Sequence, residues 1–424
     1  MKLMNVKGTF DYLPKDMKIR NQITDTLRKN FDLYGYAPIE TPIINYYDLL
    51  SYKYDKDAEI LSEIYKLTDQ GERNLGLRYD LTVPFCKVVA MNKNLTLPFR
   101  RYEIGRVFRN GPVKLGRTRE FYQCDIDVVG IDNRLIEAEQ ISMAIKIFKD
   151  LGIDAVVKYN NRKLMSGLIL YTEIEEEKIN KVIGIIDKIE KVKKEELYDL
   201  LTDIEIPKEK IDKLLDLFTK NLSYYKKISK ENNLIQEGIL ELEELNEYLI
   251  ALGIIDNCKF TPTLARGLSI YTGVVFEFYD KEKRVTSAIG GGGRYNKIIT
   301  NFIDDGTNYP AIGLSFGLEP IYVILKEMNK ANRLIDIYMV PLDTNIETLN
   351  LANTLREQGY RVLIEMNKKK ISKCFEYAER ENIKYIMIIG ENEITSNIFK
   401  IKDMEEKKEY SIKKEELLNY LNNR

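Results

Sequence analysis

The amino-acid sequence predicts a mixed α/β fold: an α+β core built on an antiparallel sheet, followed by a separate α/β domain. Polar and apolar residues alternate between turn signals in the first 130 residues and again at 268–295, which is typical of antiparallel strands. Between 172 and 257, Lys and Glu recur at helical spacing with almost no glycine, which predicts an inserted helical module. After Lys330 strand and helix patterns alternate, which predicts the second domain.

Length and composition limit the number of domains and the class of protein. A chain of 424 residues exceeds what one hydrophobic core usually organises, so about two or three domains are expected. Its 44% hydrophobic residues and net charge of -1 predict a globular protein in which any polyanion site is local. No apolar run is long enough for a signal peptide or a membrane span, so we expect a cytoplasmic protein without membrane association.

Histidine and cysteine usage narrows the chemistry further. The chain has no histidine, which excludes Ser/His and Cys/His nucleophile pairs and histidine metal ligands. Compositional drift is the alternative explanation, since tryptophan is absent as well. Four widely separated cysteines argue against a zinc site or a disulfide framework and are expected to be buried thiols. They are Cys86, Cys124, Cys258 and Cys374.

The core elements follow in order along the first 160 residues. A helix is expected over 17–35, ending at Gly35, and an edge strand after it, because Pro38 and Pro42 interrupt the run. Short strands are expected between 64 and 89, and a longer strand up to Gly111. Further on, the sequence predicts an amphipathic helix at 134–151 and a strand at 155–160.

Two segments complete the sheet and the second domain. Residues 268–280 and 284–295 predict a hairpin with the charged turn DKEK between its strands, so the helical module interrupts one sheet. Beyond Lys330 the order strand, helix, strand, helix, strand predicts a domain of roughly ninety residues.

The stretch 100–119 is the most cationic part of the predicted sheet, with seven Lys or Arg residues against the single acid Glu103. Phosphate is the natural ligand of such a stretch, and a solvated hairpin crossed by ion pairs is the alternative. In the strand that follows, Gln123, Asp125 and Asp127 share one face with Phe121. An ammonium group beside an anion fits this face, and an amino acid bound next to ATP supplies both.

Two further stretches are candidates for binding. In 75–84 the residues Arg78, Asp80 and Thr82 alternate onto one predicted strand face, which is either a second ammonium contact or an ordinary exposed face. The run GGGG at 290–293 follows a predicted strand and either lies against a ligand or forms a flexible turn. The absence of GxxxxGK[ST] excludes a P-loop, and no acidic metal cage stands out, which leaves magnesium bridging phosphates open.

Seven segments stand out along the chain: KGTFDYLP (7–14), YAPIETP (36–42), LRYDLTVP (77–84), FRNGPVKLGRTREFYQCDIDVVG (108–130), LARGLSIYTG (264–273), GGGGRY (290–295) and GLSFGLEPI (313–321). Together they resemble the histidyl-tRNA synthetase family, and the resemblance extends through nearly the whole chain. The first segments are similar to the class II synthetase motifs 1 and 2, and LARGLSIYTG is similar to the histidine-specific signature.

The resemblance implies a class II synthetase fold and a division into four parts. These are a first part of the catalytic core with motifs 1 and 2 (1–171), a helical insertion (172–257), a second part of the core with the histidine signature and motif 3 (258–330), and a C-terminal mixed α/β anticodon-binding domain (331–424). It also implies a homodimer, with Pro42 at the interface.

Residue roles follow from the resemblance position by position. Arg109 and Arg266 are implied as the catalytic pair on the α-phosphate of ATP, Arg266 also touching the substrate carboxylate. The implied histidine-binding set is Asp80, Thr82 and Gln123 on the α-amino group, Asp127 and Tyr271 on the imidazole, and Tyr295 closing the pocket. The implied ATP-binding set is Arg109, Arg117, Arg119 and Arg266.

The implied activity is that of a histidine–tRNA ligase. It would join histidine and ATP into an adenylate, with Mg2+ bound mainly through the ATP phosphates, and transfer histidine to tRNA-His. The substrate carboxylate is already a nucleophile, so adenylate formation needs alignment and charge stabilisation but no histidine base.

The sequence departs from the family pattern at three places. Ser269 and Ile270 replace an acid and an aromatic of the signature, and Gly111 replaces a glutamate after Arg109. Pro320 replaces the motif 3 arginine that normally stacks on adenine and reaches the terminal phosphate. Two other functions therefore stay open: a histidine-sensing regulatory subunit of the ATP phosphoribosyltransferase type, and a tRNA sensor that does not charge tRNA.

Overall fold

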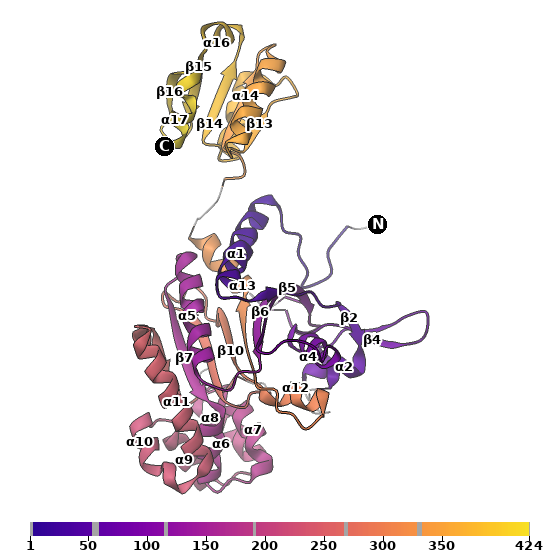
Figure 1. The fold of residues 1–424 in the computed structure, drawn as a ribbon, viewed down its shortest axis with the longest axis vertical. Coiled ribbons are helices and arrows are strands. Elements are labelled where there is room, and N and C mark those ends of the chain that lie inside the picture. Colours follow the sequence, from indigo (N-terminus) through magenta and orange to yellow (C-terminus); the bar gives the residue numbers. More distant parts are fainter. Residues whose placement is uncertain are drawn as a thin grey trace. The chain divides into compact units, whose positions relative to one another are not determined.

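The computed structural model describes residues 3–52, 59–113, 118–189, 192–266, 270–328 and 333–423. The chain divides into two compact units (Figure 1). The first contains Arg20–Met328 and the residues before Tyr12, and the second contains the residues after Met328 together with Tyr12–Ile19. Each is described by itself.

The first unit is built on an eight-stranded sheet with the order β1-β5-β6-β11-β10-β9-β7-β8. The inner pairs are antiparallel, while β1–β5 and β7–β8 are parallel. The strands are β1 (Ala37–Pro38), β5 (Phe99–Phe108), β6 (Glu120–Val129), β7 (Ala155–Asn161), β8 (Cys258–Phe260), β9 (Val274–Asp280), β10 (Gly290–Arg294) and β11 (Ala311–Gly317).

Helices anchor the sheet through aromatic and aliphatic side chains. Phe31 of α1 packs on Phe316 of β11 at 5.7 Å between ring centroids, and Phe148 of α5 packs on the same ring at 5.6 Å. Residues of α4 and α12 form a second apolar cluster with Tyr295 and Val129. The helices around the sheet are α1 (Pro14–Leu33), α4 (Thr82–Met91), α5 (Leu135–Asp150), α12 (Asn296–Ile303) and α13 (Leu318–Glu327).

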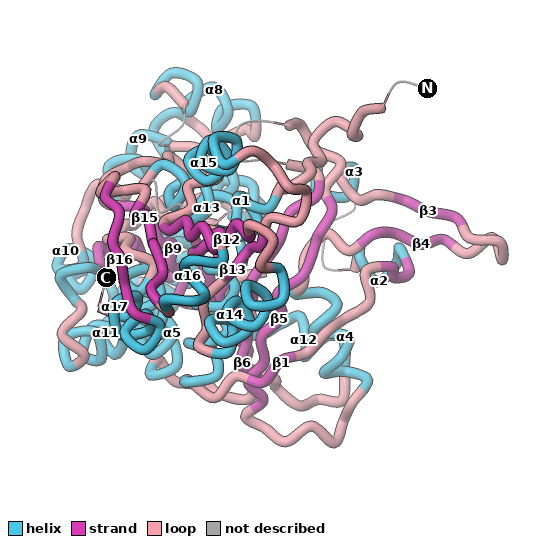
Figure 2. Tube along the Cα trace, turned by 90° about the horizontal axis from the view of Figure 1, so that it is seen from above, coloured by secondary structure: helices cyan, strands magenta, loops and turns pink. Residues whose placement is uncertain are grey.

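A small sheet with the order β2-β4-β3 lies beside the large one, and its β3–β4 hairpin projects from the unit (Figure 2). Two short helices, α2 and α3, lie between β2 and β3 in the chain. The elements are β2 (Ile44–Tyr46), α2 (Tyr47–Ser51), α3 (Glu59–Ser62), β3 (Lys66–Thr68) and β4 (Asn74–Leu77).

The segment between β7 and β8 is helical, and its helices gather beside the β7 end of the large sheet (Figure 1). Asn161 and Asn232 cap α6 and α11 by accepting backbone N–H bonds, which fixes where both helices begin. Gly238 lets α11 lie directly on α6, because a Cβ there would meet that of Leu164 at 2.8 Å. The helices are α6 (Arg162–Tyr171), η1 (Glu176–Lys178), α7 (Ile179–Ile186), α8 (Lys194–Asp203), α9 (Lys208–Leu217), α10 (Leu222–Ile228), η2 (Ser229–Glu231), α11 (Asn233–Ala251) and η3 (Ile255–Asn257).

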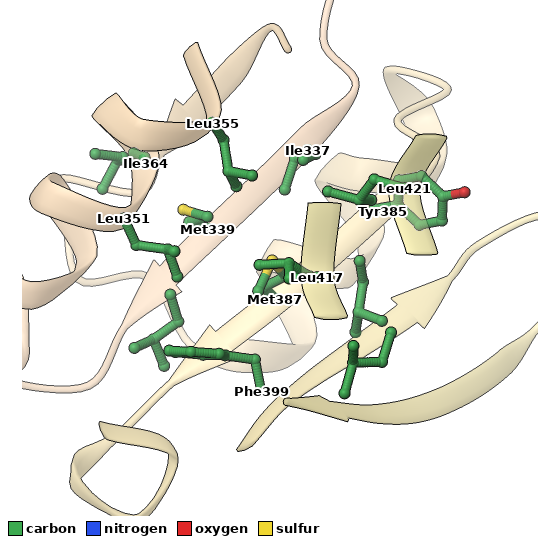
Figure 3. Close-up of a cluster of buried hydrophobic side chains, with 14 residues drawn as sticks. Ile337, Met339, Leu351, Leu355, Ile364, Tyr385, Met387, Phe399, Leu417 and Leu421 are labelled. Atoms are coloured by element: carbon green, nitrogen blue, oxygen red, sulfur yellow. The ribbon is translucent and has the colours of Figure 1, made fainter. Parts of the chain in front are cut away.

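The second unit is a five-stranded sheet with the order β13-β12-β14-β15-β16. Its core is apolar on both faces, and Met339, Met387 and Leu355 lie at the centre of one of them (Figure 3). The elements are β12 (Ile337–Pro341), α14 (Asn345–Glu357), β13 (Val362–Ile364), α15 (Ile371–Arg380), β14 (Tyr385–Ile389), α16 (Glu391–Ser396), β15 (Ile398–Asp403), β16 (Lys408–Lys413), η4 (Lys414–Glu416) and α17 (Leu417–Asn422). The strand–helix alternation accounts for the parallel trio β13-β12-β14.

The predicted fold class is confirmed, and two local predictions were wrong. Residues 78–82 are not a strand: β4 ends at Leu77, and α4 begins at Thr82. Pro84 falls in the first helical turn, where its missing N–H costs nothing, and that favours a helix start. The run 290–293 does not follow a strand but is itself strand β10.

All four cysteines are free, and three of them are buried; Cys258 is half-buried. Within the described ranges no helix is long and apolar enough to cross a membrane.

Candidate active site

A cavity of about 770 Å3 lies on one face of the eight-stranded sheet. Strands β6, β10 and β11 supply its floor, and the turn before α4 and the first turn of α13 border it. Eight of the residues implied by the resemblance line this one cavity although they are spread over more than two hundred positions of the chain. They are Asp80, Thr82, Arg109, Gln123, Asp127, Arg266, Tyr271 and Tyr295.

Glycines in the strands make room for the large side chains above them. A Cβ at Gly291 would collide with the Arg266 guanidinium, and a Cβ at Gly313 would collide with the Asp127 carboxylate and the Tyr295 ring. Within a strand glycine is otherwise unfavourable, so these positions indicate close approach by neighbouring groups. The same crowding occurs at Gly105, Gly293 and Gly317.

Asp127 is one of the buried polar groups that line the cavity. Its side chain is 3% exposed, accepts a hydrogen bond from the Tyr295 hydroxyl and forms an ion pair with Arg101. Burial raises the pKa of Asp127 to about 6, although Arg101 opposes the shift. The Tyr295 ring packs in the apolar cluster of α4 and α12, which fixes the direction of its hydroxyl.

Arg101 is a site residue that the sequence analysis missed. Its side chain is fully buried, and its guanidinium lies over the Phe85 ring at 4.4 Å. Burial lowers the pKa of Arg101, but the charges of Asp127 and Asp125 raise it by more than burial lowers it. The group therefore stays charged. The pairing of β5 with β6 places Arg101 opposite Asp127, and no pattern within β5 alone indicates this contact.

The neighbouring carboxylate, Asp125, lies on the same face of β6. Its pKa is raised to about 7, first by burial and then by the charge of Asp127, against the attraction of Arg101. Two acids and one arginine are therefore buried side by side beneath the cavity.

The other end of β6 carries polar groups suited to an ammonium ion. The Gln123 amide donates to Ser315 Oγ at 3.5 Å, while its carbonyl oxygen is buried and makes no hydrogen bond in the described part of the chain. Asp80 accepts a hydrogen bond from the Val83 backbone at 3.0 Å, which holds it at the start of α4 beside Thr82.

Two arginines reach the open side of the cavity. The Arg109 guanidinium lies between the rings of Tyr79 and Phe121, at 4.3 and 4.8 Å. Arg266 has a left-handed backbone with φ of 45°, and its Nη1 donates to the Phe276 carbonyl at 3.3 Å. Aromatic faces and carbonyls orient both groups.

Groups close to Arg266 change the pKa of its guanidinium. Burial lowers the pKa of Arg266, while Tyr271 and Glu277 raise it, so the net direction is upward. Glu277 lies 3.8 Å from the guanidinium, and Asp187, at the end of α7, also lines the cavity. The sequence analysis missed both acids, and in the case of Asp187 nothing in the helical segment indicates that it reaches the site.

Not every predicted residue joins the cavity. Arg119 is not among the residues that line the cavity. Its Nε donates to the Gly111 carbonyl at 3.2 Å, and its backbone N–H donates to the Gly8 carbonyl. Arg117 and Ser269 lie outside the described residues. Pro320, the third residue of α13, lines the cavity where the family pattern has an arginine, and Ile270 lines it as well.

The described residues contain no cluster of three or more Cys, Asp or Glu side chains that could hold a metal ion.

Comparison with known proteins identifies the two units. Residues 8–321 match the family model described as histidyl-tRNA synthetase, and residues 336–424 match the model described as an anticodon binding domain. The chain is 44% identical to histidine–tRNA ligase 1 of Bacillus cereus, over 99% of this chain and 100% of that protein. It is 43% identical to histidine–tRNA ligase 2 of Shouchella clausii, over 95% of this chain and 96% of that protein.

Solved structures give the same result. The histidyl-tRNA synthetase from Nostoc sp. PCC 7120 superposes with a TM-score of 0.87 at 28% identity, with all of both chains covered. A structure described as an ATP phosphoribosyltransferase regulatory subunit/histidyl-tRNA synthetase, from Bacillus halodurans, superposes with a TM-score of 0.76 over 92% of this chain and 99% of that one. At 21% identity the second likeness concerns the fold alone. The chain belongs to the histidyl-tRNA synthetase family.

Proposed function

We propose that this protein is a histidine–tRNA ligase, which activates histidine with ATP and transfers it to tRNA-His. One observation carries the proposal. A single cavity holds acceptors for an ammonium group, a buried carboxylate–tyrosine pair suited to imidazole, and two oriented, charged arginines. Histidine beside ATP offers the complementary groups, and the family membership supports this assignment.

In the first step a carboxylate oxygen of histidine attacks the α-phosphorus of ATP, and pyrophosphate leaves. Asp80, Thr82 and Gln123 hold the α-ammonium group, while Asp127 and Tyr271 hold the imidazole. Arg266 and Arg109 stabilise the negative charge that moves over the α-phosphate during the attack, and because the nucleophile is already ionised no base is needed. Bound Mg2+ would neutralise charge on the ATP phosphates.

In the second step a terminal ribose hydroxyl of tRNA attacks the histidyl carbonyl carbon, and AMP leaves. A phosphate oxygen of the adenylate accepts the hydroxyl proton. This route is consistent with a chain that has no histidine to act as a base.

We also propose how the chain is divided and assembled. The catalytic core would comprise 1–171 and 258–330, the insertion 172–257, and the anticodon-binding domain 331–424. Beside Pro42, the apolar residues Ile43, Ile44 and Tyr46 are 41–59% exposed, which supports a homodimer through this surface. Because tRNA charging serves translation, we expect the protein in the cytoplasm.

A histidine-sensing regulatory subunit is less well supported. Its best argument is Pro320, which removes a phosphate contact. A sensor of histidine alone, however, has no use for Arg109 and Arg266, both of which face the cavity.

The test is histidine-dependent exchange of labelled pyrophosphate into ATP by the purified full-length protein. We expect exchange with histidine and none with the other amino acids. Binding of histidine without any exchange, at saturating ATP and magnesium, would replace the ligase with a sensor.

A further inference from the structure

Asp125 is the one acid on the β6 face of the cavity that the proposed reaction does not use. It lies between Gln123 and Asp127 on the same strand face, and its side chain lines the cavity. The residue is 4% exposed, and its Oδ1 makes no hydrogen bond within the described part of the protein. A buried carboxylate oxygen without a donor destabilises the fold unless a ligand supplies the missing hydrogen bond.

The nearby arginine does not account for Asp125. Arg101 forms its ion pair with Asp127 and lies 3.8 Å from Glu103, so two other carboxylates share its charge. Arg101 attracts Asp125 electrostatically but makes no hydrogen bond to it among the described contacts. The Ser315 side chain hydrogen-bonds the Asp125 carboxylate. Oδ1 is still without a donor in the described residues, and a purely structural role for Asp125 would leave that oxygen unexplained.

Two unfilled acceptors and a neighbouring carboxylate in this region suit the three donors of an ammonium group. An ammonium carries three N–H donors and no acceptor. The Gln123 carbonyl oxygen and Asp125 Oδ1 are both buried and both without a donor, and Asp80 lies close enough to influence the Asp125 carboxylate. Alternate residues of a strand are about 7 Å apart, so one ammonium between Gln123 and Asp125 can contact both.

We propose that Asp125 accepts a hydrogen bond from the α-ammonium group of histidine and is a third acidic determinant of substrate binding, beside Asp80 and Asp127. The proposal rests on the histidine site proposed above. It assigns the acidic pair of β6 two different tasks: Asp127 contacts the imidazole, and Asp125 contacts the amino group.

The test compares two ligands that differ only in the α-amino group. Binding of histidine and of imidazolepropionate, which lacks that group, is measured by calorimetry at pH 8 for the wild type and for Asp125→Asn. The variant keeps the size of the side chain but loses the charge, so we expect histidine to bind about tenfold to a hundredfold more weakly. Imidazolepropionate is expected to bind with nearly unchanged affinity.

Glu120→Gln is the matched control, because it neutralises an acid on the same strand outside the cavity. Glu120 pairs with Arg106 at 2.8 Å, and its side chain is 30% exposed. This variant is expected to bind both ligands like the wild type. Asp125→Ser provides a second variant for the same two titrations if Asp125→Asn does not fold.

Three results would overturn the proposal: unchanged histidine affinity in the Asp125 variants, equal losses for both ligands, or a wild type that binds no histidine. The second would mean that Asp125 supports the imidazole pocket. Because binding is measured without ATP, the result is independent of the exchange assay. A protein that binds histidine through Asp125 but does not exchange pyrophosphate would contradict the ligase and leave this contact standing.

Discussion

The cavity face of the eight-stranded sheet and one core face of the five-stranded sheet bury different kinds of side chain. The eight-stranded sheet carries Arg101, Asp125 and Asp127 beneath its cavity, each at most 4% exposed. The five-stranded sheet buries residues such as Met339 and Met387 on a face without buried charges in its core cluster. Burying charge destabilises the folded state, whereas burying apolar side chains stabilises it. The first sheet therefore depends for its stability on the apolar side chains of the helices packed against it. The comparison indicates that the charged residues beneath the cavity lower the stability of the fold and serve a binding site instead.

The largest effect is expected when the chain is shortened to end at Met328, which removes the five-stranded sheet. Each unit has its own hydrophobic core, so the shortened protein should fold and still exchange pyrophosphate with histidine. Charging of tRNA-His should be almost lost, because the anticodon-binding contacts are gone. Exchange and charging rates measured side by side test this expectation. Equal charging by both proteins would show that the second unit does not contribute to tRNA binding.

Removing the buried arginine tests the electrostatic cost directly. Arg101→Met leaves Asp127 and Asp125 without their cation, and breaking a buried pair in this way costs about 3–5 kcal/mol. The loss should be smaller at pH 5 than at pH 8, because the carboxyls can then take up protons. Calorimetry should show a lower transition temperature for the first unit alone. Met387→Ala, in the core of the second sheet, is the control and should destabilise the second unit equally at both pH values.

Asp127→Ala should remove selection for histidine. The imidazole N–H would face an empty site, and the Tyr295 hydroxyl would lose the carboxylate that accepts its hydrogen bond. We expect the KM for histidine in pyrophosphate exchange to rise about a hundredfold, while the KM for ATP changes little. An unchanged KM for histidine would place the imidazole elsewhere.

Sequence patterns predicted which side chains of a strand share a face, because that pattern repeats along the strand. They did not predict contacts that depend on how two strands are paired. The alternation in β6 correctly placed Gln123, Asp125 and Asp127 on one face, because the side-chain period of a strand is two. The role of Arg101 follows only from its pairing opposite Asp127, which no single-strand pattern contains. The approach of Asp187 to the cavity was likewise missed, since it depends on tertiary contacts. The β15–β16 hairpin was missed although it is a local feature, with a short charged turn between its two strands.

The pKa of Asp125 provides a smaller test of the same cost. Its pKa is raised from 3.8 to about 7, so the folded state binds more protons than the unfolded state between those values. Stability therefore falls as pH rises through this window, and the sign is opposite to that of a salt-bridged acid. Asp125→Asn removes the penalty, so the gain in transition temperature over wild type should be larger at pH 8 than at pH 5. An equal gain at both pH values would contradict the raised pKa.

The smallest expected effect concerns Pro320, where a cation is missing from an otherwise charged site. The buried Arg20 is held by Glu319, the residue before Pro320, in two hydrogen bonds of 2.7 and 2.9 Å, so it is not free to substitute. Arg109 and Arg266 act where charge shifts during the attack, whereas a group at position 320 would hold the leaving pyrophosphate. Pro320→Arg should therefore lower the KM for ATP by about three- to tenfold and change kcat less. The gain is limited because a cation in the first turn of α13 opposes the helix dipole. Pro320→Met, which adds length without charge, should leave the KM for ATP unchanged, and an equal improvement in both variants would assign the effect to loss of the proline rather than to the charge.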